Sequence, residues 1–429
     1  MKKTILIILI SLAIIFSLAF YMSSQDDETK IINEIPKEDA QYDIVIVGAG
    51  LSGLSSAYNL NDYNVLILEK ENRAGGRVLT KTQEDINYDM GAIFAYPDYI
   101  VPFAIESSEL IKESGPLGLY YNDKLYFCDS VINCISQTNA MPNNDYSLKS
   151  ILSSNESRDI LNAFFQTIHP GEIEDYITER QEDALVKYEN TRYLKGNTEL
   201  VEAYQNNINA ELQFNSTVTS VEDLGDKVKI TYTQNDVERV IFTKSAIVTT
   251  PSYIAKKIIN NISQASQEFL DNIKYAEMTV VAIGLKNNNL ENFSYLITPQ
   301  MTTSAIVNNY NDEKNINILL AYIADKNSKD LTNKTDLEIT NEVIEILQTT
   351  LNIRENDVLF TDLVTWPQTS AVISEQMLKD IPGNYNQAST RIFLAGDYTD
   401  LSSNFPYGMS SAIKSGENVS KKIIEFLKK

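Results

Sequence analysis

The alternation of apolar and polar positions near residue 42 predicts a strand, a helix and a second strand in close succession. Residues 42–47 form a short apolar run, and residues 51–60 repeat their apolar positions at helical spacing. Another apolar run follows at 65–68. This order predicts a βαβ unit.

Three glycines lie between the first strand and the helix. Gly48 allows a tight turn, Gly50 lets the backbone approach a pyrophosphate, and Gly53 lets helix and strand pack closely. The helix N-terminus faces the same anion. Glu69 ends the second strand, where a carboxylate accepts hydrogen bonds from ribose hydroxyls and repels a 2′-phosphate. The segment therefore predicts a dinucleotide site that favours FAD or NAD over NADP.

Farther along the chain, alternating positions predict more strands. Residues 227–233 alternate apolar and polar side chains, as a half-exposed strand does, after a turn at Gly225 and Asp226. The stretches MTVVAIGL and INILLAYIA, within 275–325, predict a sheet that floors a substrate cavity. Residues 98–190 are mixed but largely helical in pattern.

Composition and charge narrow the class of protein. The chain has 429 residues, of which 43% are hydrophobic and 22% charged, a balance typical of a globular protein with two domains. Its formal charge of −22 repels phosphate backbones, which argues against a nucleic-acid partner.

The sole histidine, His169, and the two cysteines, Cys128 and Cys134, show no metal-ligand spacing. No GxSxG segment supports a Ser-His-Asp triad, so His169 fits a surface or capped position better than a catalytic base. The two cysteines either close a small disulfide loop or remain free thiols.

The amino-terminal residues predict export. Lys2 and Lys3 precede an uncharged run over residues 4–22, and the acidic sequence DDETK follows it. The run is about long enough to span a bilayer and also ends in a weak small-residue cleavage pattern, so residues 1–25 are either a signal peptide or a membrane anchor. Residues 26–41 then form a tether, and the rest of the chain lies at the periplasmic or extracellular face.

A second glycine turn follows the strand that ends at 68. In KENRAGGRVLT, paired glycines that expose backbone donors lie between arginines, which bind phosphate bidentately. The residues concerned are Arg73, Gly75, Gly76 and Arg77. The pattern ExxxRxGGR after GxGxxG resembles the flavin-containing amine oxidase and protoporphyrinogen oxidase superfamily. This resemblance implies that the segment wraps the phosphates of FAD.

The resemblance extends toward the carboxyl end. STVTSVEDLGDKVKITYT resembles the family's strand beside the adenine, which implies that Val218 contacts adenine through its backbone. RIFLAGDYTD and FPYGMSSA resemble the family's closing motif, which implies that Gly396 and Asp397 hold the ribityl or pyrophosphate region. A helix would follow with its N-terminus at the flavin. The residues implied to lie under the isoalloxazine are Met409, Ser410 and Ala412. Because no cysteine or histidine lies near this motif, the FAD is expected to be non-covalent.

Together these features predict an α/β fold. A Rossmann-like FAD-binding domain is assembled from discontinuous segments, and an α+β substrate domain contains a mixed sheet. The FAD-binding domain is predicted at residues 42–95, 195–252 and 385–429. The substrate domain is predicted at residues 96–194 and 253–384.

The resemblance also implies the chemistry. In the superfamily a substrate C–H bond passes a hydride to flavin N5, and oxygen or a quinone reoxidises the flavin. Alignment of KYAEMTVVAIGL places Thr279 where amine oxidases keep a lysine. The nearby Lys274 is displaced along the strand and would not point the same way, because each step along a strand reverses the side chain. Tyr407 lies one position from the family's aromatic residue beside the flavin. Trp366, the only tryptophan, either borders the cavity or packs in the core. These three residues, Thr279, Tyr407 and Trp366, are the catalytic candidates.

Three functions fit these features. The first is an FAD-dependent oxidase of an amine or amino acid, because the acidic stretch GEIEDYITERQED would attract a cationic small-molecule substrate. The second is a protoporphyrinogen oxidase-like or desaturase-like dehydrogenase that acts on a C–C bond, which the missing lysine and the membrane segment favour. The third is a non-catalytic FAD-binding protein.

Overall fold

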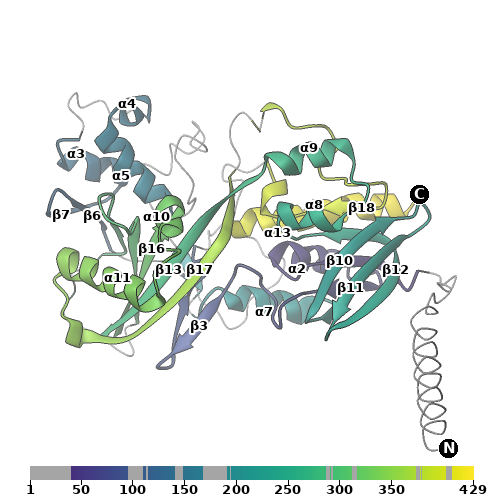
Figure 1. Cartoon of the computed structure of the whole chain (residues 1–429), viewed down its shortest axis with the longest axis horizontal. Helices are drawn as coiled ribbons and strands as arrows, with labels where there is room; N and C mark the ends of the chain where they lie inside the picture. The colour runs from purple at the N-terminus through teal and green to yellow at the C-terminus, as the bar shows by residue number, and fades with distance from the viewer. Residues whose placement is uncertain are drawn as a thin grey trace, which may run out of the picture. The chain divides into compact units, whose positions relative to one another are not determined.

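A computed structural model describes most of the chain beyond residue 39. The described residues are 40–94, 110–112, 115–140, 148–167, 191–193, 195–286, 290, 293–311, 316–372, 377, 379–401 and 408–429. Within them, Tyr42–Lys429 forms one compact unit that contains two seven-stranded sheets (Figure 1). No helix among the described residues has the length and apolarity to cross a bilayer. The run at 4–22, His169 and Tyr407 lie outside the described residues.

The first sheet is Rossmann-like. Its strand order is β10-β11-β12-β1-β2-β9, and β18 also pairs with β12. Strand β1 is parallel to both β2 and β12, whereas β10, β11 and β12 form an antiparallel meander. The strands are β1 (Tyr42–Val47), β2 (Val65–Leu68), β9 (Glu211–Gln213), β10 (Ser216–Asp223), β11 (Val228–Gln234), β12 (Val237–Val248) and β18 (Ile392–Leu394). The predicted βαβ unit and the strand at 227–233 are confirmed.

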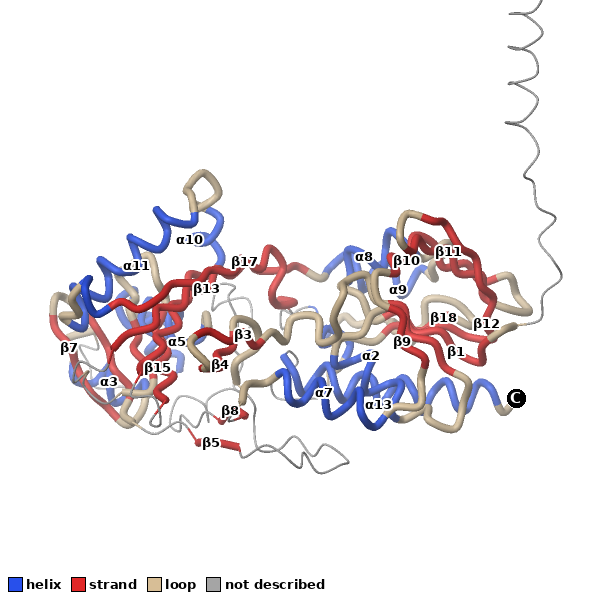
Figure 2. Tube along the Cα trace, turned by 90° about the horizontal axis from the view of Figure 1, so that it is seen from below, coloured by secondary structure: helices blue, strands red, loops and turns tan. Residues whose placement is uncertain are grey.

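Helices cover both faces of this sheet, and β1 therefore buries side chains on both sides. Ile44 and Ile46 pack with the cluster that includes α2 (Leu51–Tyr58), α7 (Thr198–Asn207) and α13 (Gly408–Leu427). Val45 and Val47 pack with the cluster that includes α8 (Ser252–Ile258) and α9 (Gln264–Asn272). Figure 2 shows these two groups of helices on opposite sides of the strands. Burial on both faces is what a parallel sheet of this type requires.

The second sheet is mixed. Its order is β17-β13-β16-β15-β14-β6-β7, and only the β14–β6 pair is parallel among these described strands. The strands are β6 (Leu117–Tyr121), β7 (Lys124–Cys128), β13 (Lys274–Lys286), β14 (Tyr295–Ile297), β15 (Ala305–Asn311), β16 (Ile316–Ala324) and β17 (Val358–Val372). The strands predicted from MTVVAIGL and INILLAYIA lie within β13 and β16. The α/β fold with a second, mixed sheet is therefore confirmed.

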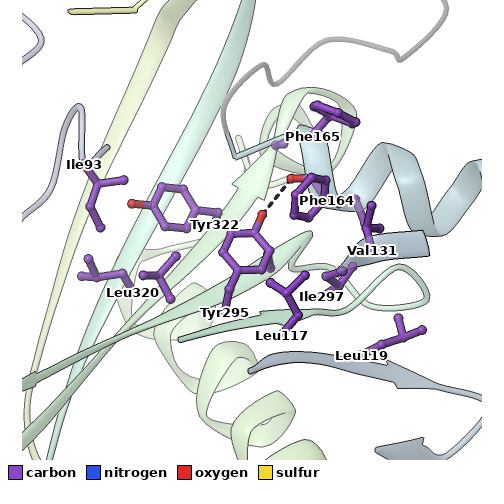
Figure 3. Packing of buried hydrophobic residues seen from close by; sticks show 14 of the residues in the cluster. Ile93, Leu117, Leu119, Val131, Phe164, Phe165, Tyr295, Ile297, Leu320 and Tyr322 are labelled. Carbon is purple, nitrogen blue, oxygen red and sulfur yellow. Dashed lines mark hydrogen bonds between the residues drawn. The ribbon is translucent and has the colours of Figure 1, made fainter. Parts of the chain in front are cut away.

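The two faces of the second sheet have different partners. Met278, Val280 and Ala282 of β13 face a cluster that includes α3 (Val131–Gln137) and α5 (Asn155–Phe165), part of which is drawn in Figure 3. We call this side of the sheet the inner face. Val281 and Ile283 face the opposite, outer side, which packs against α11 (Asp336–Leu351). The remaining named elements are short: α4 (Leu148–Ser153), α10 (Asp325–Lys329), the hairpin β3 (Thr80–Gln83) and β4 (Ile86–Asp89), the pair β5 (Leu110–Lys112) and β8 (Thr191–Tyr193), and the 3-10 helices η3 (Glu355–Asp357) and η4 (Asp397–Thr399).

Cys128 and Cys134 are joined in a disulfide that ties the end of β7 to α3. Their Cα atoms are 5.3 Å apart, within the range that a disulfide spans. The structure thus selects one of the two alternatives that the sequence left open for these cysteines.

Candidate functional site

The first glycine loop joins β1 to α2, and each glycine meets a different constraint. Gly48 has a φ of +107°, and a Cβ there would lie 2.7 Å from Thr249 Oγ1. A Cβ on Gly53 would lie 2.0 Å from the Gly48 carbonyl oxygen. Gly50 differs, because a Cβ there would meet nothing within 4 Å. The space beside Gly50 is therefore open, as the approach of a pyrophosphate to the backbone requires.

Glu69 links this loop to the end of β2. Its carboxylate accepts hydrogen bonds from the backbone N–H of Ala49 at 2.7 Å and of Glu71 at 2.9 Å. Its own carbonyl accepts from Ser216 N at 2.8 Å, so β10, which carries Val218, begins beside it. Glu69 and Val218, predicted to contact the ribose and adenine, thus come from neighbouring segments. The interaction of Glu69 with Ala49 is a contact that the sequence pattern did not reveal.

The second glycine turn lies against the first. Gly75 N donates to Ala49 O at 2.8 Å, and a Cβ on Gly76 would lie 3.6 Å from Gly50 Cα. Arg73 donates to the carbonyls at 74, 76 and 78 over 2.6–3.0 Å. This guanidinium therefore shapes the turn itself, and its predicted contact with phosphate stays a prediction.

Arg77 joins three segments that are distant in the sequence. Its guanidinium donates to Thr369 O on β17 and forms a 2.7 Å ion pair with Asp397, whose side chain is 4% exposed. Burial alone would lower the pKa of Arg77, but the Asp397 carboxylate outweighs it and raises this pKa. Arg77 therefore remains a cation where the second sheet meets the carboxyl-terminal motif.

The carboxyl-terminal helix lies against the first glycine loop. Gly396 N donates to Ser415 Oγ at 3.0 Å, and Ser415 Oγ lies 2.9 Å from Ser52 Oγ on α2. A Cβ on Gly416 would lie 2.4 Å from Ser52 O, so α13 and α2 approach each other through their backbones. The first turns of α13 carry the residues predicted to lie beneath the flavin, which are Met409, Ser410 and Ala412. The two predicted cofactor segments therefore lie together.

Asn197, which the sequence did not single out, positions the segment after β4. Its Nδ2 donates to the carbonyls of Ala92 and Ile93, both at 2.8 Å, and its backbone N–H donates to Asp89 Oδ1 at 2.9 Å. The Asn197 side chain is fully buried. The sequence showed only that Asn197 lies in the KGN turn before α7. The burial of its amide depends on tertiary packing and could not be read from the sequence.

Trp366 lies on the inner face of the second sheet. It pairs with Met278 of β13, and its Nε1 donates to Met90 O at 2.7 Å. The indole is half-buried and packs against the inner-face cluster. Trp366 thus contacts both the second sheet and the segment that follows the glycine turns.

Thr279 lies on the other face, and its predicted catalytic role stays a prediction. It pairs with Thr365, and its Oγ1 lies 2.9 Å from Thr365 Oγ1 and 2.8 Å from Ser328 Oγ of α10. Because side chains alternate along a strand, Thr279 points away from the face that Trp366 shares with Met278. The inner face of this part of β13 carries Met278 and Val280, and neither side chain ionises.

A further polar contact fastens the hairpin β3–β4 to β17. Lys81 Nζ lies 2.8 Å from Asp362 Oδ2, and Tyr88 Oη donates to the same oxygen at 3.0 Å. Burial, together with the hydrogen bond to Asp362, raises the pKa of Tyr88. This contact fixes the strand that leads into the segment at 89–93.

Comparisons with known proteins agree with this arrangement. Residues 142–424, more than half of the chain, match the family model described as flavin containing amine oxidoreductase, and residues 46–99 match an NAD(P)-binding Rossmann-like domain. Amine oxidase [flavin-containing] A of Sus scrofa is 47% identical over 80 residues, which are 18% of this chain and 14% of that protein. The L-amino-acid oxidase of Sistrurus catenatus edwardsii is 39% identical over 79 residues, which are 17% of this chain and 15% of that protein. The matched stretch thus spans only about a seventh of each relative's length.

Solved structures are similar over most of the chain. Putrescine oxidase bound to putrescine superposes with a TM-score of 0.70 at 14% identity, covering 90% of this chain and 99% of that one. A putative protoporphyrinogen oxidase from Exiguobacterium sp. gives 0.72 at 13% identity, with coverage of 90% and 99%. Cyclohexylamine oxidase from Brevibacterium oxydans gives 0.71 at 12% identity, with coverage of 90% and 100%. At these identities the likeness shows a shared fold.

Proposed function

Because this chain belongs to the flavin containing amine oxidoreductase family, we propose that it binds FAD non-covalently and uses it to oxidise an amine or amino acid. The observation that carries the proposal is the meeting of the glycine loop with the carboxyl-terminal motif. Arg77 bonds to Asp397 at 2.7 Å, and Ser52 lies 2.9 Å from Ser415. Because the two segments lie side by side, one cofactor could contact both of them.

The described residues fit a dinucleotide. The open space beside Gly50, with the N-terminus of α2 behind it, would receive the pyrophosphate. Glu69 and Val218 would lie at the adenosine end, and the first turns of α13 at the isoalloxazine end. When bound, the flavin supplies the acceptor for the hydride of a substrate C–H bond. The described first turns of α13 contain no cysteine or histidine, which supports non-covalent binding.

The chain's own residues would orient the substrate and exclude water. The inner face of the second sheet offers apolar side chains such as Met278 and Val280, with Trp366 beside them. Trp366 is held by its hydrogen bond to Met90, so its ring has a fixed position. An apolar wall favours an amine in its neutral form, because burial disfavours an ammonium ion.

Purified protein tests this proposal through its flavin. A purified protein of residues 40–429 is expected to be yellow from bound flavin, and denaturation should release this flavin from the polypeptide. Under air, a panel of primary amines and amino acids is added, with the corresponding alcohols and hydroxy acids as controls. Bleaching and peroxide release with an amine but not with its alcohol support amine oxidation. A colourless folded protein, or a yellow one that no amine bleaches, contradicts it.

A second candidate is a dehydrogenase that acts on a C–C bond. It is favoured by the inner face of β13, where Met278 and Val280 stand in place of an ionisable side chain. A cyclic or polyene donor that bleaches the flavin, with a quinone as acceptor and no response to amines, would establish this alternative. Oxygen or a quinone can serve as acceptor in either reaction.

We further propose that the protein is exported, either tethered by residues 4–22 or released after their cleavage. The support is the charge pattern around that run and the Cys128–Cys134 disulfide, which is typical of oxidising compartments. Added protease should degrade the full chain in intact spheroplasts, whereas a chain without residues 1–25 should be protected. Equal protection of both would contradict export.

A further inference from the structure

Tyr322 carries a buried hydroxyl whose hydrogen-bonding capacity is unused among the described residues. The side chain lies on β16 and is 2% exposed, and its Oη has no hydrogen-bond partner in the part of the chain that the structure describes. Buried polar groups nearly always have a partner, because an unpaired one loses its hydration without compensation. This hydroxyl therefore requires a partner from outside the described chain.

The neighbouring Tyr295 shows how a purely structural tyrosine is satisfied in the same cluster. Its Oη donates to Phe164 O at 2.8 Å and lies 2.6 Å from Thr167 Oγ1. Figure 3 shows that the hydroxyl of Tyr322 points away from Tyr295 and toward Ile93. The two rings share one cluster, yet among the described residues only Tyr295 is anchored through its oxygen.

The Tyr322 hydroxyl faces the segment that leads away from the second glycine turn. Ile93 belongs to that segment, and its carbonyl is held by Asn197 Nδ2 at 2.8 Å. Tyr322 pairs with Val280 on β13, so it shares the inner face with Met278 and Trp366. Burial, followed by the charge of Asp89, raises the pKa of Tyr322, which keeps its hydroxyl protonated.

We propose that Tyr322 Oη hydrogen-bonds the amino group of the substrate, whose apolar part lies along the inner face. This inference rests on the proposed function and names the group that recognises the substrate. A phenol hydroxyl can accept from an N–H or donate to a nitrogen lone pair, so it suits an amine. The surrounding apolar side chains suit an amine with a hydrocarbon body.

The test compares Tyr322→Phe with Tyr295→Phe in the flavin-loaded full chain. The probe is the amine that bleaches the wild-type flavin fastest, paired with the isostere in which a methyl group replaces the amino group. The dissociation constant of the amine comes from the dependence of the rate of flavin reduction without oxygen on amine concentration, that of the isostere from the perturbation of the oxidised flavin spectrum, and thermal midpoints come from circular dichroism. Both substitutions remove one oxygen atom and leave the ring in place.

Tyr322→Phe is expected to keep or raise the thermal midpoint, because its hydroxyl has no partner to lose among the described residues. It should weaken binding of the amine about tenfold and leave binding of the isostere unchanged. Tyr295→Phe should lower the midpoint, because Phe164 O and Thr167 lose a partner, and should leave the preference for amine over isostere unchanged.

Two results would overturn the inference about Tyr322. One is a Tyr322→Phe protein that binds the amine as wild type does, and the other is a protein that loses affinity equally for amine and isostere. A wild-type flavin that no amine bleaches is a separate outcome, which overturns the proposed function together with this inference. Bleaching of the wild type with an unaltered variant overturns only the role of Tyr322.

Discussion

At the scale of single residues, the glycines between β1 and α2 separate the requirements of the fold from those of the ligand. A Cβ added to Gly48 or Gly53 would lie 2.7 or 2.0 Å from protein atoms, whereas one added to Gly50 would enter open space. The sequence spacing named all three residues. Only the structure shows that one of them, Gly50, is not required by the packing of the residues that it describes.

Gly50→Ala is expected to preserve the fold and weaken flavin binding. Its φ of −69° is accessible to alanine, and its Cβ would meet nothing within 4 Å. That Cβ would occupy the space of the pyrophosphate, so flavin affinity should fall about tenfold or more. Fluorescence titration with FAD and the thermal midpoint of the flavin-free protein measure the two effects.

Gly53→Ala serves as the matched control. Its Cβ would lie 2.0 Å from Gly48 O, so we expect a loss of about 1–3 kcal/mol in the free energy of unfolding. If Gly50→Ala destabilised the flavin-free protein as much as Gly53→Ala does, or bound FAD as wild type does, the open space would not be the pyrophosphate site.

The face of β13 on which each residue lies could not be read from the sequence. An alignment by sequence cannot fix which face of β13 a residue occupies, because a shift of one position reverses it. The pairing with β17 is irregular between Ala276 and Met278, and this irregularity places Met278 rather than Thr279 on the inner face. The buried contacts of Asn197 and Ser415 were equally invisible, since their partners lie far away in the sequence.

At the scale of elements, the contact between α2 and α13 brings the two ends of the site together. Four residues make it close: Gly416, and the serines at 52, 55 and 415. Ser55 Oγ donates to Ile413 O at 2.8 Å, which ties the helices by hydrogen bonds as well as by packing. The motifs predicted each helix by itself, and the small residues between them make the close approach possible.

Gly416→Ala is expected to impair both stability and flavin binding. The new Cβ would lie 2.4 Å from Ser52 O and 2.9 Å from Ser56 N, which forces α13 away from the glycine loop. We expect a cost of about 1–3 kcal/mol in the free energy of unfolding, measured by urea denaturation. Flavin affinity should fall in the same variant, as measured by FAD titration.

Lys414→Ala is the control on the same helix, because Lys414 is exposed. Lys414→Ala should leave both the free energy of unfolding and the affinity for flavin close to those of wild type. A Gly416→Ala protein that loses stability yet binds flavin normally would show that the contact between the helices does not shape the cofactor site.

At the scale of the whole molecule, buried tyrosines set the alkaline limit of stability. Burial raises the pKa of three tyrosines to about 12, with further contributions from neighbouring acidic groups: Tyr204, Tyr275 and Tyr385. In the unfolded chain a tyrosine has a pKa of about 10. The raised pKa values of these tyrosines therefore stabilise the folded protein fully below pH 10, and this stabilisation is lost as the pH rises toward 12.

We therefore expect two phases in an alkaline titration. Exposed tyrosines should ionise near pH 10 with the fold intact, and the buried ones only together with unfolding at a higher pH. Tyrosinate absorbance and far-ultraviolet circular dichroism, recorded together, measure the two events. Tyr385→Phe should reduce the slope of stability against pH above 10, and an unchanged slope or complete ionisation with the fold intact would contradict this expectation.

The sequence by itself determined the local units of this protein. The apolar runs, the glycine spacings and the closing motif predicted the βαβ unit, the mixed sheet and the segments that would contact FAD, because turns and strand periodicity depend on neighbouring residues. The family resemblance gave the expected chemistry.

Only the tertiary structure decided how these units meet. It placed α13 against α2, paired Arg77 with Asp397, turned Thr279 to the outer face and left the hydroxyl of Tyr322 without a hydrogen-bond partner among the described residues. These features depend on contacts between residues tens to hundreds of positions apart. Packing, and not local pattern, fixes such contacts.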